Sequence, residues 1–217
     1  MDFWSPIRIS LQVTLLASVF SFVLALIATW WMVRRSFKGK VVVETILMLP
    51  LVLPPTVVGF GLLVIFGRQS WIGKGIEWLF HQPIVFTWWA AVIAATVVAF
   101  PLVYQTLKTG FESVNKELEE AARSMGANEW QVFRYVTFPL SWRFTLSGYM
   151  LGFTRAIGEF GATLMFAGDI PGKTETIPIA IFMAAESGDM ALAAYWVVSI
   201  VVFSFLLLSL VHRIRRN

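Results

Sequence analysis

Two charged residues in an otherwise uncharged stretch have the types and spacing that could do chemistry. Arg155 and Glu159 lie four residues apart within residues 144–166, so a helix would place both on one face. Charges inside a membrane are costly, and they usually face a protein interior or water. Two interpretations stay open. Either the pair is a neutral structural ion pair, or Glu159 has another partner and Arg155 attracts an anion.

Small residues and prolines accompany this pair. A stripe of glycines at helical spacing, which would let helices approach closely, comprises Gly148, Gly152, Gly158 and Gly161. In the stretch LPLVLPPTVVGFG, Pro54 and Pro55 remove backbone donors and bend a helix. We expect these prolines, the charged pair and the glycines to lie along a pathway or at a helix interface, with plain packing as the alternative.

The sequence offers no catalytic or metal-binding motif. It has no HExxH, no GxSxG and no GxxxxGK[ST] phosphate loop, and it contains no cysteine. His81 and His212 are each isolated, without metal-ligand spacing. We therefore expect no catalytic residue, no metal and no cofactor, and we do not expect this chain to hydrolyse ATP itself.

The elements that must position these residues are membrane helices. The 217 residues are 58% hydrophobic and only 14% charged, against about 25% charged in soluble domains, so lipid must be the solvent. Spanning a core of ~30 Å takes about 20 apolar residues. The chain has five such runs, at residues 9–33, 45–67, 85–107, 144–166 and 190–211. We predict one domain over residues 1–217, an all-α integral membrane protein with five spans; a sixth would need residues 177–185 to cross.

Lysine and arginine in the loops set the orientation, and they explain the net charge of +4 without nucleic acid. With five spans, four basic residues face one side: Arg8, Arg68, Lys74 and Lys173. Twelve face the other: Arg34, Arg35, Lys38, Lys40, Lys108, Lys116, Arg123, Arg134, Arg143, Arg213, Arg215 and Arg216. This asymmetry predicts an outside N-terminus, a cytoplasmic C-terminus and a cytoplasmic loop over residues 108–143.

That loop contains a polar helix–turn–helix, EAARSMGANEWQVFRYVTFP. Three glutamates open a short helix that carries a small apolar face, including Met125. Gly126 occupies a left-handed C-cap position, Asn128 and Gln131 have capping-box spacing, and Pro139 is expected to end the second helix. Docking to a soluble partner and lying on the lipid surface both fit this pattern.

The segment resembles the EAA motif of permease subunits of ABC importers. Glu120, Ala121 and Ala122 match, Gly126 follows after three residues, and Pro139 closes the motif. The resemblance implies a coupling helix seated in a cleft of a separate ATP-hydrolysing subunit. Two copies of that ATPase would close on ATP and tilt the membrane helices between inward-open and outward-open states.

GEFGA, the loop DIPGKTETIP and PLVLPP together resemble molybdate permeases, with sulfate permeases as near relatives. The resemblance implies type I importer architecture, a homodimer in a prokaryotic cell membrane, and an extracytoplasmic binding protein that docks on residues 67–82 and 167–189. It implies import of molybdate or tungstate, two anions that the sequence does not distinguish. Sulfate or thiosulfate import is the alternative. An ion-gradient-driven secondary transporter is the alternative of another class, although no internal repeat is visible.

Overall fold

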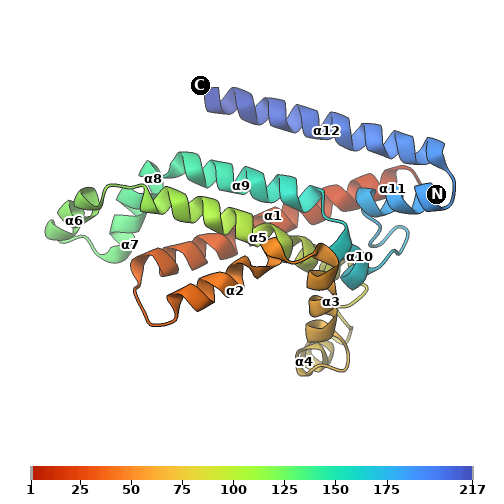
Figure 1. The fold of residues 1–217 in the computed structure, drawn as a ribbon, viewed down its shortest axis with the longest axis horizontal. Coiled ribbons are helices and arrows are strands. Elements are labelled where there is room, and N and C mark those ends of the chain that lie inside the picture. The colour runs from red at the N-terminus through yellow and green to blue at the C-terminus, as the bar shows by residue number, and fades with distance from the viewer. Residues whose placement is uncertain (1, 217) are drawn as a thin grey trace.

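The computed structural model describes residues 2–216, with side chains described for residues 2–206 and 209. Three helices form its centre: α1 (Trp4–Arg34), α5 (Trp88–Glu112) and α9 (Trp142–Ile157). They run side by side and pack on one another (Figure 1). The faces in contact are rich in small side chains such as Ala17, Ala94 and Gly152, all buried, which allow close helix packing. The predicted all-α class is confirmed.

The other helices are shorter and surround this centre. They are α2 (Lys40–Val52), α3 (Pro55–Phe66), α4 (Trp71–Phe80), α6 (Lys116–Ser124), α7 (Glu129–Val132), α8 (Phe138–Leu140), α10 (Gly161–Ala167), α11 (Ile177–Glu186) and α12 (Met190–Arg216), with a π-helical turn η1 (Phe133–Thr137) between α7 and α8. In Figure 1, α6 and α7 lie at one end of the bundle, while α11 and the start of α12 lie at the other end.

The second expected span is broken where the prolines predict a bend. Helix α2 ends at Val52, α3 begins at Pro55, and their axes differ by 117°. Leu53 and Pro54 between them are extended, because a proline ring disfavours helical geometry in the residue before it. The prediction of a bend is therefore confirmed, although the run does not form one straight helix.

The fourth expected span, residues 144–166, is wrong as one continuous helix. Helix α9 ends at Ile157, and α10 restarts the helix at Gly161 after a turn. The Glu159 carboxylate accepts a hydrogen bond from the Ala162 N–H at 2.8 Å, so it satisfies a free donor at the start of α10. Hydropathy alone conceals this break, because the flanking residues are apolar on both sides.

The glycine stripe makes its close contacts inside the chain. A Cβ atom at Gly152 would collide with Val103 of α5, and one at Gly161 would lie 3.1 Å from Cβ of Pro55. The half-helix α10 therefore packs directly against the start of α3, and the two helix breaks lie side by side. Whether this helix also borders a second subunit stays a prediction.

The predicted spans correspond to helices of different lengths. Among the described residues, α1 and α5 are each long and apolar enough to cross a membrane, and the bent pair α2–α3 would add a third span. Helix α11 has 10 residues, too few to cross a ~30 Å core at 1.5 Å per residue. The last expected span, residues 190–211, lies within α12. The basic end of this helix contains Arg213, Arg215 and Arg216, whose side chains lie outside the part of the chain that the structure describes.

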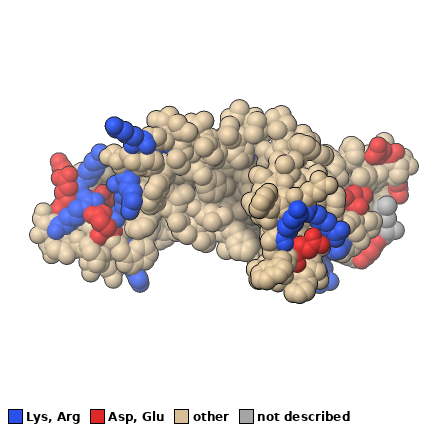
Figure 2. All heavy atoms as spheres, turned by 90° about the horizontal axis from the view of Figure 1, so that it is seen from below, with Lys and Arg blue, Asp and Glu red and all other residues tan. Residues whose placement is uncertain are grey.

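Charged side chains gather in two groups separated by an uncharged surface (Figure 2). One group covers the end formed by α6 and α7, and the other lies toward the opposite end. A belt of apolar atoms between two charged surfaces is what a membrane-spanning body requires. The loop after α1 and the loop after α5 lie at the same end, as the charge count predicts.

Candidate functional site: a charged helical loop and a helix break

The charged loop begins with a cap that the sequence analysis overlooked. The Asn115 side chain accepts a hydrogen bond from the Glu117 N–H at 3.0 Å and caps α6. Asparagine before a glutamate-rich turn is a recognisable N-cap signal. Two of the three glutamates, Glu117 and Glu119, lie in the first turn of α6, where carboxylates are favourable.

Gly126 ends this first helix as predicted. Its φ is +90°, a left-handed value that strains any residue with a Cβ atom. The Gly126 N–H donates to the Arg123 carbonyl at 2.9 Å, and the Ala127 N–H donates to the Ala122 carbonyl at 3.1 Å. Ala122 is buried beneath the turn, whereas Ala121 and Met125 are exposed. The exposed turn therefore presents one small and one flexible apolar side chain to solvent.

The second helix begins with the predicted capping box. The Gln131 N–H donates to Asn128 Oδ1 at 2.9 Å, and the Asn128 N–H donates to Gln131 Oε1 at 2.8 Å. The expectation that Pro139 ends this helix is wrong. The chain instead widens into the π-turn η1 and continues through Pro139 to Leu140. A proline clashes with the carbonyl four residues earlier, and a wider π-turn just before it removes that clash.

An ion-pair network that the sequence analysis missed ties the loop to α1. The Glu129 carboxylate lies 2.6 Å from Arg34 Nη1 and 2.7 Å from Arg123 Nε. The Arg34 Nη1 also donates to the Glu129 carbonyl at 2.5 Å. The Arg123 hydrogen bond lowers the pKa of Glu129, and the same bond raises the pKa of Arg123. Both groups therefore stay charged at neutral pH.

Two adjacent glutamates of the loop have different surroundings. Glu119 accepts a hydrogen bond from the Thr137 hydroxyl at 2.5 Å, and its other oxygen lies 3.4 Å from Arg123 Nη2. Glu120 is exposed, and no ion pair involves it among the described side chains. Glu119 therefore holds the loop together, whereas Glu120 is available to a partner.

Aromatic packing reinforces the attachment to α1. The Trp30 ring lies 6.1 Å from Phe133 and 6.3 Å from Trp130, and the Arg34 guanidinium lies over Trp30 at 5.6 Å. The two contacts between rings join residues about 100 positions apart in sequence, so no local pattern could reveal them. They attach the loop to α1 by side-chain packing.

The turn between α9 and α10, together with the adjacent bend between α2 and α3, is called the membrane break below. Within it, Arg155 and Glu159 pair with each other. Arg155 Nη1 lies 2.8 Å from Glu159 Oε2, and no other ion pair of Glu159 is present among the described side chains. Glu159 is buried with 3% of its surface exposed, while 28% of the Arg155 side chain is accessible. The carboxylate thus serves both the helix cap and the pair, and of the two side chains only that of Arg155 is partly exposed.

The remaining residues predicted at this place divide by exposure. Pro54, Pro55 and Gly158 are exposed, and Gly161 is buried against the start of α3. All of residues 51–57 are exposed in the single chain. The break therefore has a packed inner side and an open outer side, and the open side is free to line a pathway or to meet another subunit.

Comparisons with known proteins agree on one family. Residues 13–216 match the family described as "Binding-protein-dependent transport system inner membrane component". The permease protein YvgM of Bacillus subtilis (strain 168) is 53% identical over 98% of this chain and 93% of its own length. The molybdenum transport system permease protein ModB of Escherichia coli (strain K12) is 41% identical over 91% of this chain and 87% of its own length.

A solved structure supports the fold. The crystal structure of a bacterial ABC transporter involved in the import of the acidic polysaccharide alginate superposes with a TM-score of 0.79. The match covers 100% of this chain and 80% of that chain at 15% sequence identity, so it concerns the fold alone.

Proposed function

This chain belongs to the family of inner-membrane components of binding-protein-dependent transport systems, and from this premise we propose that it is the permease subunit of an ATP-driven molybdate importer. It spans the cell membrane several times. A separate ATPase hydrolyses the ATP, and a separate extracytoplasmic protein captures the anion. The chain itself forms the passage and receives the force.

The charged loop is the observation that carries this proposal. Ala121, Met125 and Glu120 are exposed at the tip of a turn that is fixed by caps at both helices and by the Glu129 network. A rigid, exposed projection joined to a long helix can receive a push and transmit it. We propose that this projection docks into the ATPase on the cytoplasmic side, which places the N-terminus outside and the C-terminus inside.

The membrane break is proposed as the moving part of the pathway. The exposed residues Pro54, Pro55 and Gly158, together with Arg155, would face the passage or a second copy of the chain. Glu159 and Gly161 hold the break in place from its buried side. Two copies of the permease would then pair with two ATPase subunits, each copy presenting one charged loop.

Molybdate is proposed as the cargo because ModB of Escherichia coli, named for molybdenum transport, is 41% identical over 91% of the chain. Tungstate has the same shape and charge, so both dianions should compete. Sulfate is smaller and is the comparison substrate.

Reconstitution into liposomes tests the proposal. The permease, its cognate ATPase and its cognate binding protein should take up radiolabelled molybdate only with ATP, and tungstate should compete better than sulfate. An ATPase whose Walker lysine is replaced should abolish uptake. Uptake by the permease alone, driven by a proton or sodium gradient, would contradict the proposal in favour of a secondary transporter.

A further inference from the structure

A pocket of about 1020 Å³ lies toward the end of the molecule opposite the charged loop. The α3–α4 hairpin, the segment before α5 and the loop between α10 and α11 line it. We propose that this pocket binds a tetrahedral oxyanion dianion before it enters the membrane pathway. The inference rests on the proposed function, and it adds a binding site to the permease itself.

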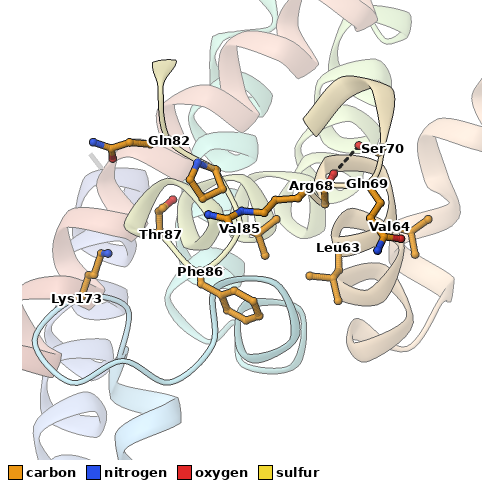
Figure 3. Close-up of a pocket in the computed structure, with 12 residues that line it drawn as sticks. Leu63, Val64, Arg68, Gln69, Ser70, Gln82, Val85, Phe86, Thr87 and Lys173 are labelled. Carbon is orange, nitrogen blue, oxygen red and sulfur yellow. Dashed lines mark hydrogen bonds between the residues drawn. The ribbon is translucent and has the colours of Figure 1, made fainter. Parts of the chain in front are cut away.

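Charge is the first argument. Two cations from distant parts of the sequence line the pocket, Arg68 after α3 and Lys173 in the α10–α11 loop, and no carboxylate lines it. Figure 3 shows the Arg68 side chain extending across the pocket toward Thr87, with Lys173 approaching from the opposite loop. Two positive charges that converge on one hollow attract a divalent anion more strongly than a monovalent one.

The nearest competing carboxylates weaken this charge only slightly. Glu77 lies 3.7 Å from Arg68 Nε, but both side chains are well exposed, and solvent screens such pairs. The contact uses Nε and leaves the Nη groups free for a ligand. In the loop of Lys173, burial raises the pKa of Asp169 and of Glu175, and neither acid lines the pocket or forms an ion pair with Lys173 among the described side chains.

Some polar groups of the pocket form hydrogen bonds that hold its walls, and others are available to bind a ligand. The Ser70 hydroxyl donates to the Gly67 carbonyl and accepts from the Gly73 N–H, so it holds the α3–α4 turn. The Thr87 hydroxyl caps α5 in the same way. The side-chain amides of Gln69 and Gln82 make no described hydrogen bond and line the same hollow. Oxyanions accept hydrogen bonds from amide and guanidinium donors.

The walls connect the pocket to the membrane break. Phe86 lines the pocket with a strained φ of +58°, and its N–H donates to the Phe166 carbonyl at the end of α10 at 3.2 Å. Leu63, on the other wall, belongs to α3. The half-helices α3 and α10, one from each helix interruption, therefore form part of the pocket or of its frame. Movement of these half-helices would change the separation of the two cations.

Direct binding to the purified permease, without ATPase or binding protein, tests this inference. Equilibrium dialysis would measure radiolabelled molybdate at constant ionic strength, with chloride as the monovalent comparison. The wild-type chain should bind molybdate, and an Arg68→Gln/Lys173→Gln double variant should bind roughly tenfold more weakly. Lys74→Gln is the matched control, because Lys74 is an exposed cation of α4 that does not line the pocket.

Transport by the full complex gives the second readout. The double variant should need several-fold more molybdate for half-maximal uptake, with an unchanged maximal rate and unchanged affinity for the binding protein. If the wild-type permease does not bind molybdate but the full complex still takes it up with ATP, the proposal of a binding pocket is overturned and the proposed function is not. Loss of binding-protein affinity in the double variant, without loss of anion binding, would also overturn it, since the cations would then serve protein docking.

Discussion

The charged loop and the membrane break are both interruptions of helix, but they differ in how tightly other segments pack around them. The loop is held by hydrogen bonds between near neighbours, from Asn128 to Gln131 and from Gly126 to Arg123, and its tip is exposed. The break is held by close contacts between distant segments, such as Gly161 on Pro55. In the function proposed above, the exposed tip would receive force from the ATPase, and the packed joint would move in response.

The largest effect is expected at the break, from Glu159→Ala. This change removes the cap of α10 and leaves Arg155 without its partner in an apolar region. We expect a loss of about 3 kcal/mol in unfolding free energy, toward the low end for a buried pair because the guanidinium is partly accessible. Thermal unfolding in detergent measures it.

The double change Arg155→Met/Glu159→Gln is the control for that prediction, because it removes both charges and keeps an acceptor at position 159. It should recover most of the lost stability. If molybdate uptake also recovers, Arg155 has only a structural role; if the protein is stable but needs more molybdate, Arg155 belongs to the pathway. A stable Glu159→Ala variant would refute the account of the joint.

The second prediction compares two glycines of α3. A Cβ atom at Gly59 would lie 2.8 Å from the Ala162 backbone, whereas one at Gly61 would meet nothing within 4 Å. Gly59→Ala should cost about 1–3 kcal/mol through overpacking of α3 on α10. Gly61→Ala should be neutral or slightly stabilising. Equal unfolding temperatures for the two variants would mean that the half-helices are not in close contact.

The third prediction compares two left-handed glycines at the end that carries the charged loop. Gly126 and Gly39 have φ values of +90° and +94°, and neither has an atom near its Cβ position. Alanine should strain both backbones by about 1–2 kcal/mol. Only Gly126→Ala should reduce ATP-driven uptake several-fold, because only that turn shapes the docking tip. Equal losses of uptake would show general strain instead of a failure of coupling.

The smallest effect separates the two adjacent glutamates. Glu119→Gln should lower the unfolding temperature slightly, since it weakens the contact with Arg123. Glu120→Gln should leave stability unchanged and reduce co-purification with the ATPase, most clearly at moderate salt. Should Glu119→Gln reduce co-purification more than Glu120→Gln at equal stability, the assignment of the exposed face would be reversed.

The comparison also explains what the sequence could predict. The cap at Asn128, the left-handed Gly126 and the bend at Pro54 and Pro55 were predictable, because each depends on residues a few positions apart. The continuation of the helix through Pro139 was not, because a π-turn absorbs the expected clash and a single proline pattern fits both outcomes.

Features that depend on which partner a charged group meets were out of reach. The restart of helix at Gly161 depends on the Glu159 carboxylate turning to cap α10, whereas the residues on both sides of the charged pair are apolar. The attachment of the loop depends on Arg34 meeting Glu129, which lies 95 residues further along the chain. In both cases the role of a charged side chain depends on the partner that it meets in the fold, which its residue type does not reveal.

The most direct test of the central claim uses the absence of cysteine from the chain. A single Met125→Cys change places a thiol at a side chain that is 83% exposed on the loop tip, and Trp71→Cys places one at a 95% exposed site on α4. In sealed cells, an impermeant maleimide should label Trp71→Cys only. In the assembled complex, Met125→Cys should cross-link to the ATPase. Labelling of Met125→Cys from outside, or an ATPase cross-link only from position 71, would contradict the account.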